Sequence, residues 1–263
     1  EQSVTLQHLL IGEVWLCAGQ SNMVMPLNGF DYCPISDSNN VIADAPNHPG
    51  IRMVTIKPTV KLSPQEYAEG SWQQPTTENA PKFSAAAYHY ALTLQRTLQI
   101  PIGVITCAWG GSRVEGWLPK EILQTYKDED LTLIGSDKTP VYLQSMLMYN
   151  GILYPCHKYT IKGFIWYQGE SNVRSSRTYA ERLATMVKHW RSIWKQGDLP
   201  FYYVETVPFA CEYKEDGYIG ALLREAQQKA LSLIPNSGMI GTNDLVETYE
   251  APQVHPHNKK GIG

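Results

Sequence analysis

The chain has 263 residues, 43% of them hydrophobic, and a formal net charge of −3 at pH 7, which suits a globular domain with a substantial core and excludes a disordered chain. The small negative charge, spread without runs of like sign, gives no attraction to nucleic acid or to an anionic membrane. No stretch reaches the roughly 18 consecutive apolar residues that span a bilayer. The sequence therefore predicts neither a nucleic-acid partner nor a membrane partner.

Apolar runs that end in glycine and small polar residues alternate with helical patterns along the chain. In chain order, the expected strands lie at 12–22, 51–57, 100–112, 162–172, 199–209 and 237–244, and the expected helices at 84–99, 178–196 and 219–233. Strands that alternate with helices indicate an α/β fold with a mostly parallel sheet covered by helices. Cys17 and Cys107 lie inside two of these strands and are expected in the core.

Four of the strands are followed by short polar loops. In a parallel sheet the carboxyl ends of the strands share one edge, and ligands bind outside that edge. We therefore expect the loops at 19–22, 110–112, 168–170 and 243–244 to meet in one pocket. Taken alone, Ser21 would be read as a helix cap that follows a bend at Gly19, but this convergence favours a catalytic role.

A pocket of this kind needs a nucleophile and donors for an oxyanion. Ser21 is preferred to Ser112 and Ser171 because it directly follows a strand and Gly-Gln, where a sharp turn holds a hydroxyl out ahead of a helix. Gly111 either lets a backbone N–H approach a ligand closely or is an ordinary loop glycine. The amide of Gln168 either donates to an oxyanion or makes a structural hydrogen bond.

Two of the seven histidines, His255 and His257, lie in the segment QVHPHNKKGIG (253–263) beyond the last strand. A side chain in such a loop can reach back over the sheet edge as a general base. The pair could also hold a metal ion, but no cluster of further ligands accompanies it, and the five cysteines show no zinc-type spacing. We expect no metal and no cofactor. Pairing of Cys33 with Cys211 stays open.

Four motifs, in this order over nearly the whole chain, resemble those of the sialate O-acetylesterase family of SGNH hydrolases: GQSNM (19–23), WGGSRVEGW (109–117), WYQGESN (166–172) and HPHNK (255–259). The resemblance implies a three-layer, flavodoxin-like α/β fold and a carbohydrate esterase without a cofactor. It also implies that Ser21 is the nucleophile and His255 the base. The N–H groups of Ser21 and Gly111 and the amide of Gln168 would form the oxyanion hole.

The acid that would orient His255 is not evident. The superfamily often has an aspartate three residues before the histidine, whereas this chain has Pro252. Three alternatives are open: Asp244, Glu170, or a backbone carbonyl within 250–254. Asp244 is favoured because it keeps the family's chain order of serine, then aspartate, then histidine.

Several side chains near the motifs are candidates for contact with a sugar. Polar contacts are expected from Asn22, Arg113 and Glu115, and the aromatic rings either stack on a sugar or pack in the core, these being Trp109, Trp117, Trp166 and Tyr167.

The leading hypothesis is a serine esterase that removes O-acetyl groups from carbohydrate, most favourably sialic acid, through an acetyl-enzyme. Acetyl xylan or another polysaccharide is the alternative substrate, and a carbohydrate-binding protein with impaired catalysis is the alternative function. We expect residues 12–263 to form the esterase domain, truncated before a further helix, and residues 1–11 to be the last strand of a preceding β-rich domain. The family's glycan substrates imply a location outside the cytoplasm, and the oligomeric state is not indicated.

Overall fold

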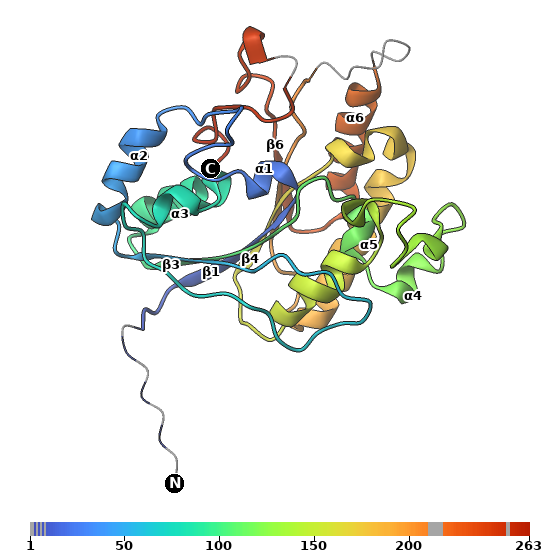
Figure 1. Cartoon of the computed structure of the whole chain (residues 1–263), viewed down its shortest axis with the longest axis horizontal. Coiled ribbons are helices and arrows are strands. Elements are labelled where there is room, and N and C mark those ends of the chain that lie inside the picture. The colour runs from blue at the N-terminus through green and yellow to red at the C-terminus, as the bar shows by residue number, and fades with distance from the viewer. Residues whose placement is uncertain (1–2, 4, 6, 8, 210–217, 251–252) are drawn as a thin grey trace.

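The computed structural model describes residues 3, 5, 7, 9–209, 218–250 and 253–263. A six-stranded sheet forms the centre of this part of the chain (Figure 1). Its strands are β1 (Glu13–Gly19), β2 (Ile51–Thr55), β3 (Ile102–Ala108), β4 (Gly163–Tyr167), β5 (Phe201–Val204) and β6 (Ser237–Ile240). They lie in the order β2-β3-β1-β4-β5-β6, and every neighbouring pair is parallel. The expected parallel α/β sheet is confirmed.

Helices cover both faces of the sheet, and its central strands are accordingly mostly apolar. Successive side chains of a strand point to opposite faces. Trp15 and Cys17 of β1 pack in the cluster with α3 (Ala85–Leu98), whereas Leu16 and Ala18 pack in the cluster with α5 (Ser176–Trp194) and α6 (Ile219–Leu233). Figure 1 shows α3 on one side of the sheet and α5 and α6 on the other. The fold therefore has three layers, as expected.

The three long helices occur where the sequence predicts them. The N-cap of α3 is Ser84, whose Oγ accepts the N–H of Ala87. The shorter helices are α1 (Ser21–Val24), α2 (Ser38–Asp44) and α4 (Lys120–Leu123). The strand expected over 199–209 stops at Val204, because the N–H and the hydroxyl of Thr206 bind the side chain of Gln227 on α6.

Two expectations fall partly outside the described residues. Residues 1–11 were expected to end a β-rich domain, but 1–2, 4, 6 and 8 are not described, and the described residues among them form no strand. Cys33 is a free thiol, and Cys211 lies outside the described residues. Cys17 and Cys107 are buried, as expected. No helix in the described part of the chain has the length and apolar character needed to cross a bilayer.

The register of the three central strands places their following loops side by side. Gly19, the last residue of β1, is paired with Ala108 and with Tyr167. A Cβ on Gly19 would lie 2.1 Å from the carbonyl oxygen of Tyr167, and its φ is +148°, so only glycine fits here. The loops after β1, β3 and β4 meet, as the sequence predicts.

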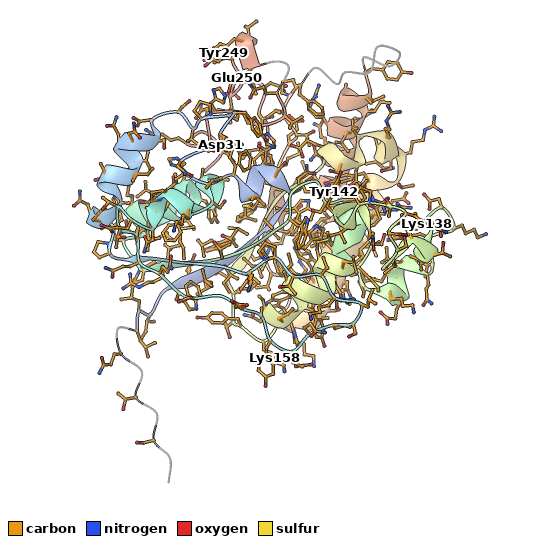
Figure 2. All side chains as sticks on the ribbon, in the orientation of Figure 1. Asp31, Lys138, Tyr142, Lys158, Tyr249 and Glu250 are labelled. Carbon is orange, nitrogen blue, oxygen red and sulfur yellow. The ribbon has the colours of Figure 1, made fainter. Side chains whose placement is uncertain are left out.

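The fourth loop, at 243–244, follows β6, which is the edge strand and is separated from β1 by β4 and β5. Figure 2 shows Asp31, Tyr142 and Glu250 on the side of the molecule where α1 begins, with Lys158 on the opposite side. The candidate site lies on that first side.

Candidate active site

The turn after β1 holds Ser21 at the first position of α1, with Gln20 as the N-cap and no capping hydrogen bond from a side chain. Ser21 is therefore not the cap of this helix. In the part of the chain that the structure describes, its hydroxyl makes no hydrogen bond. Gln20 anchors the turn instead, because its Oε1 accepts the N–H groups of Gly169 and Ser171, each at 3.3 Å. Gln20 is thus held in place, and the hydroxyl of Ser21 stays unbonded.

The loop after β3 lies beside Ser21. A Cβ on Gly110 would lie 3.8 Å from the Cβ of Ser21. Gly111 has a φ of +73°, a conformation that favours glycine. Its N–H donates to no acceptor among the described residues, whereas the next N–H, that of Ser112, bonds to the carbonyl of Trp109. The N–H of Gly111 is thus available in the loop beside Ser21, and its donation to an oxyanion stays a prediction.

The amide of Gln168 is fully buried and has no free donor. Its Nε2 donates to the carbonyl of Ser112 at 3.0 Å and to Oδ1 of Asn172 at 2.8 Å. Its Oε1 accepts the hydroxyl of Tyr179 at 3.0 Å. The expected donation to an oxyanion does not fit this geometry, and the alternative reading, a structural hydrogen bond, is the one observed. Gln168 holds the loop that carries Gly111.

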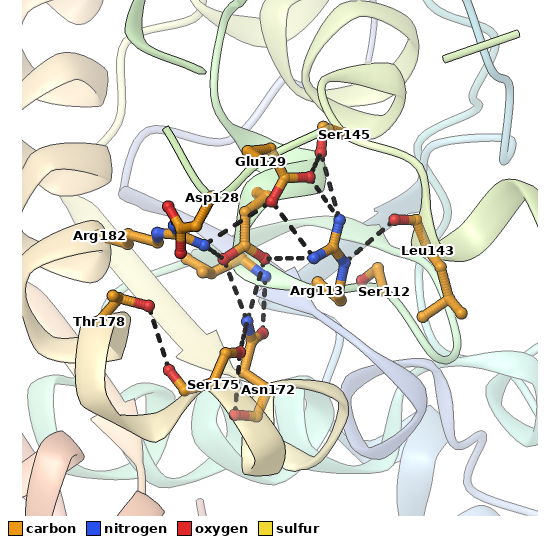
Figure 3. A network of polar contacts seen from close by, with 12 residues as sticks. Ser112, Arg113, Asp128, Glu129, Leu143, Ser145, Asn172, Ser175, Thr178 and Arg182 are labelled. Atoms are coloured by element: carbon orange, nitrogen blue, oxygen red, sulfur yellow. Dashed lines mark hydrogen bonds and ion pairs between the residues drawn. The ribbon is translucent and has the colours of Figure 1, made fainter. Parts of the chain in front are cut away.

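A network of charged and polar side chains begins at Arg113, directly after the same loop (Figure 3). Glu115 is fully buried and accepts the guanidinium of Arg182 at 2.5 Å. Arg113 donates to Glu129 at 2.6 Å, and Glu129 also accepts the hydroxyl of Ser145. The expectation that Glu115 contacts a sugar is therefore wrong, because its carboxylate is enclosed and paired. The guanidinium of Arg113 is likewise directed into the protein.

The side chain of Asn22 is buried as well, which rules out the expected contact with substrate. Its Nδ2 donates to Oε1 of Glu170 and to the carbonyl of Val254, both at 2.7 Å. Its Oδ1 accepts the ammonium of Lys259 at 2.5 Å. Every hydrogen-bonding atom of this amide is thus used, and the residue after Ser21 is bonded to the residue before His255.

Two ionisable groups are buried around Asn22. Burial lowers the pKa of Lys259 to about 7, although the charge of Glu170 opposes that shift. The ammonium of Lys259 lies 5.2 Å from the ring centroid of Tyr167. Burial also raises the pKa of Glu170, whose Oε2 has no partner among the described residues. The bonded oxygen of Glu170 faces Asn22, and Glu170 makes no bond to His255. Glu170 therefore does not orient His255 in this geometry, contrary to the alternative expectation.

The imidazole of His255 is buried against the segment that follows α1. The edge of its ring meets Phe30, with centroids 5.3 Å apart, and its carbonyl accepts the thiol of Cys33 at 3.2 Å. Burial, followed by the charge of Lys259, lowers the pKa of His255 to about 4. Its Nε2 has no hydrogen-bond partner within the described chain. A neutral imidazole with an unused nitrogen is suited to accept a proton.

The expected acid Asp244 does not meet His255. It is exposed and makes no hydrogen bond or ion pair that the structure describes, because it follows the edge strand β6. A carboxylate–histidine pair does form, between Glu250 and His257. Oε1 of Glu250 lies 3.2 Å from Nδ1 of His257 and accepts the backbone N–H of His257 at 2.7 Å.

Sequence reasoning missed Glu250, which ends a short 3-10 helix (Thr248–Glu250), since a glutamate outside any motif carries no pattern. The described residues contain no group of three or more His, Cys, Asp or Glu side chains that could hold a metal ion.

The aromatic side chains of the motifs belong to the core. Trp117, Trp166 and Tyr167 are fully buried, and Trp109 packs against the buried cluster. The alternative of core packing is the one observed, because helices cover both faces of β4 and leave neither Trp166 nor Tyr167 exposed. Hollows of about 370 and 330 Å³ lie elsewhere, one beside α5 and one at the amino ends of β1 and β3. The site is defined by its chemistry rather than by either hollow.

Comparison with known proteins shows the family to which the chain belongs. Residues 11–260 match the family described as carbohydrate esterase, sialic acid-specific acetylesterase. The sialate O-acetylesterases of Homo sapiens and Pongo abelii are each 25% identical to the chain over 284 residues, which cover 99% of this chain and 53% of theirs. The chain thus spans about half the length of these relatives.

Solved structures show the same similarity. A carbohydrate acetylesterase from Xanthomonas citri superposes with a TM-score of 0.81 at 30% identity, over 95% of this chain and 54% of that one. A protein from Arabidopsis thaliana shares the fold, with a TM-score of 0.56 at 18% identity, over 95% of this chain and 92% of that one. The family match covers nearly every residue, including all four polar motifs, and the chain therefore belongs to the sialic acid-specific acetylesterase family of carbohydrate esterases.

Proposed function

We propose that this chain hydrolyses O-acetyl esters of carbohydrates through an acetyl-enzyme on Ser21, with O-acetylated sialic acid as the favoured substrate. One observation carries the proposal: the hydroxyl of Ser21 is free, lies beside the loop with the unused N–H of Gly111, and is followed by the residue bonded to the His255 loop. The names of the family and of the relatives support sialic acid as the sugar. A location outside the cytoplasm stays a prediction from the family.

The reaction proceeds in two halves. His255 takes the proton of Ser21 as the hydroxyl oxygen attacks the acetyl carbonyl, and the oxyanion accepts the N–H groups of Ser21 and Gly111. The intermediate collapses, the bond to the sugar oxygen breaks, and His255 returns the proton to that oxygen. Water, deprotonated by the same imidazole, then hydrolyses the acetyl-enzyme to acetate and free serine. Gln168 acts in this scheme by holding the loop of Gly111.

A carbohydrate-binding protein with impaired turnover is the second candidate. The observation that favours it is the environment of His255, whose ring makes no hydrogen bond with any described carboxylate. We favour a working dyad of Ser21 and His255, because contacts of the segment around His255 (the base loop, 253–259) with Asn22, Phe30 and Cys33 fix the position of the ring without a carboxylate bonded to it.

Replacement of the nucleophile is the first test. Ser21→Ala should leave the fold intact and reduce turnover of a chromogenic acetyl ester and of O-acetylated sialic acid by roughly 10³-fold or more, because the covalent site is lost. Ser171→Ala removes a hydroxyl from the neighbouring loop and should leave both rates within about twofold. Near-normal turnover by a folded Ser21→Ala protein would show that the serine is not the nucleophile.

The pH dependence of activity tests the base. A general base must be unprotonated, and the lowered pKa of His255, about 4, means that the imidazole stays neutral well below the usual histidine range near 6.5. The acid limb of kcat/KM for the chromogenic ester should therefore have its midpoint below about pH 5, in the range where circular dichroism shows a folded chain. A midpoint near 6.5 would contradict a buried, desolvated base.

Two carboxylate variants test how His255 is held. The two carboxylate oxygens of Glu250 accept the N–H of His257 and the N–H of Glu247, and Glu250→Gln keeps only one of these acceptors, so the base loop should loosen and kcat should fall roughly 10-fold. Asp244→Asn alters an exposed, unpaired group and should leave kcat within about twofold. If Asp244→Asn instead lowered kcat by the roughly 10⁴-fold typical of a lost triad acid, Asp244 would be the partner of His255 and the dyad would be wrong.

A further inference from the structure

A tight turn after α1 presents one exposed aromatic ring. Phe30 and Cys33 exchange both of their backbone hydrogen bonds, each at 2.9 Å, which leaves Asp31 and Tyr32 as the two residues of the turn. The side chain of Tyr32 is 70% exposed. Its ring stacks on that of Phe30, with centroids 5.8 Å apart and planes 22° apart. Phe30 therefore covers one face of the Tyr32 ring and leaves the other to solvent.

The turn is attached to the loop of the base. The thiol of Cys33, which is buried, donates to the carbonyl of His255, and the N–H of Ser36 donates to the carbonyl of His257 at 3.0 Å. The edge contact between Phe30 and His255 adds to these bonds, and the ring centroids of Tyr32 and His255 are 6.2 Å apart. The exposed ring thus has a fixed position beside the imidazole.

Reaction chemistry decides which part of a substrate lies there. His255 must give its proton to the departing sugar oxygen, so the sugar must be within hydrogen-bond reach of that imidazole. The acetyl oxygen must point the other way, toward the N–H of Gly111. Single exposed aromatic side chains are common and need no functional explanation. Tyr32 differs because its ring lies 6.2 Å from that of His255, the group that the leaving sugar has to reach.

We propose that Tyr32 is the platform for the sugar ring of the substrate, with the apolar C–H face of the sugar packed on its open face. This inference rests on the proposed function and adds a specificity-determining residue to it. Aromatic side chains combine a large apolar surface with a polar end, as binding sites for such amphipathic ligands require. The turn sets the position of the ring before the sugar arrives, which reduces the ordering cost of binding.

The test compares a sugar ester with an ester that has no sugar. Tyr32→Ala should raise KM for O-acetylated sialic acid roughly 3- to 10-fold with little change in kcat, and should leave both constants for ethyl acetate, whose leaving group has no ring to pack on Tyr32, unchanged. Tyr32→Phe should behave like the wild type, because the stacking face is kept. Tyr67→Ala is the matched control: Tyr67 is 90% exposed and follows Glu66, the partner of Lys158 on the opposite side of the molecule (Figure 2).

Three results would overturn the proposal. Unchanged constants for the sugar ester in Tyr32→Ala would make Tyr32 an ordinary surface residue. Equal losses of kcat on both esters would mean that it acts through the position of His255. An equal rise in KM in Tyr67→Ala would mean that the effect is not specific to the position of Tyr32.

A binding measurement separates this proposal from the esterase activity itself. O-acetylated sialic acid is titrated calorimetrically into Ser21→Ala and into the double variant Ser21→Ala/Tyr32→Ala. The affinity of the double variant should be lower by about the factor by which Tyr32→Ala raises KM. If the wild type hydrolysed neither ester, the proposed function would fail, while this titration would still support or refute the platform. Equal affinity in Ser21→Ala with and without Tyr32→Ala would refute the role of Tyr32 as a platform.

Discussion

The amide of Asn22 joins the parts of the site that the sheet alone does not connect. Its donors bind the loop after β4 and the carbonyl before His255, and its acceptor binds the buried ammonium of Lys259. The base loop belongs to an irregular segment that follows the last strand, so strand pairing cannot fix its position. A buried amide left without its partners costs about 1–3 kcal/mol for each lost group. The arrangement in which all three contacts form is therefore favoured over alternatives that form only some of them.

The two sides of Ser21 are built by different physical means. On the oxyanion side, Gln168 bonds to the carbonyl of Ser112 in the Gly111 loop, and the buried ion pair of Glu115 with Arg182 lies next to that loop. Buried ion pairs of this kind contribute little net stability, because the cost of desolvation offsets the attraction. We infer that their role here is to define position. On the base side, Asn22 binds both the buried ammonium of Lys259 and the carboxylate of Glu170. The charge of Lys259 also helps to keep His255 neutral, because it lowers the pKa of that imidazole.

The sequence predicts the features that depend on local pattern. Apolar runs and helical spacing locate the sheet and the three long helices, and the shared edge of parallel strands brings the Ser21 and Gly111 loops together. Features that depend on which faces are covered are not predictable in this way. Trp166 and Tyr167 resemble sugar-stacking residues until helices are seen on both faces of β4. Asp244 satisfies the expected chain order, yet strand order places it at the edge, a fact that no spacing reveals.

The reactivity of Ser21 toward a fluorophosphonate tests the central claim, that Asn22 joins nucleophile and base. Labelling of the Ser21 peptide, followed by mass spectrometry, should be roughly 10²-fold slower in Asn22→Leu than in wild type, since the general base is no longer held in place. Leucine is similar in volume but forms none of the three bonds. Asn39→Leu, at an exposed position on α2, should label at the wild-type rate. Wild-type labelling of Ser21 in an Asn22→Leu protein that circular dichroism shows to be folded would contradict the account.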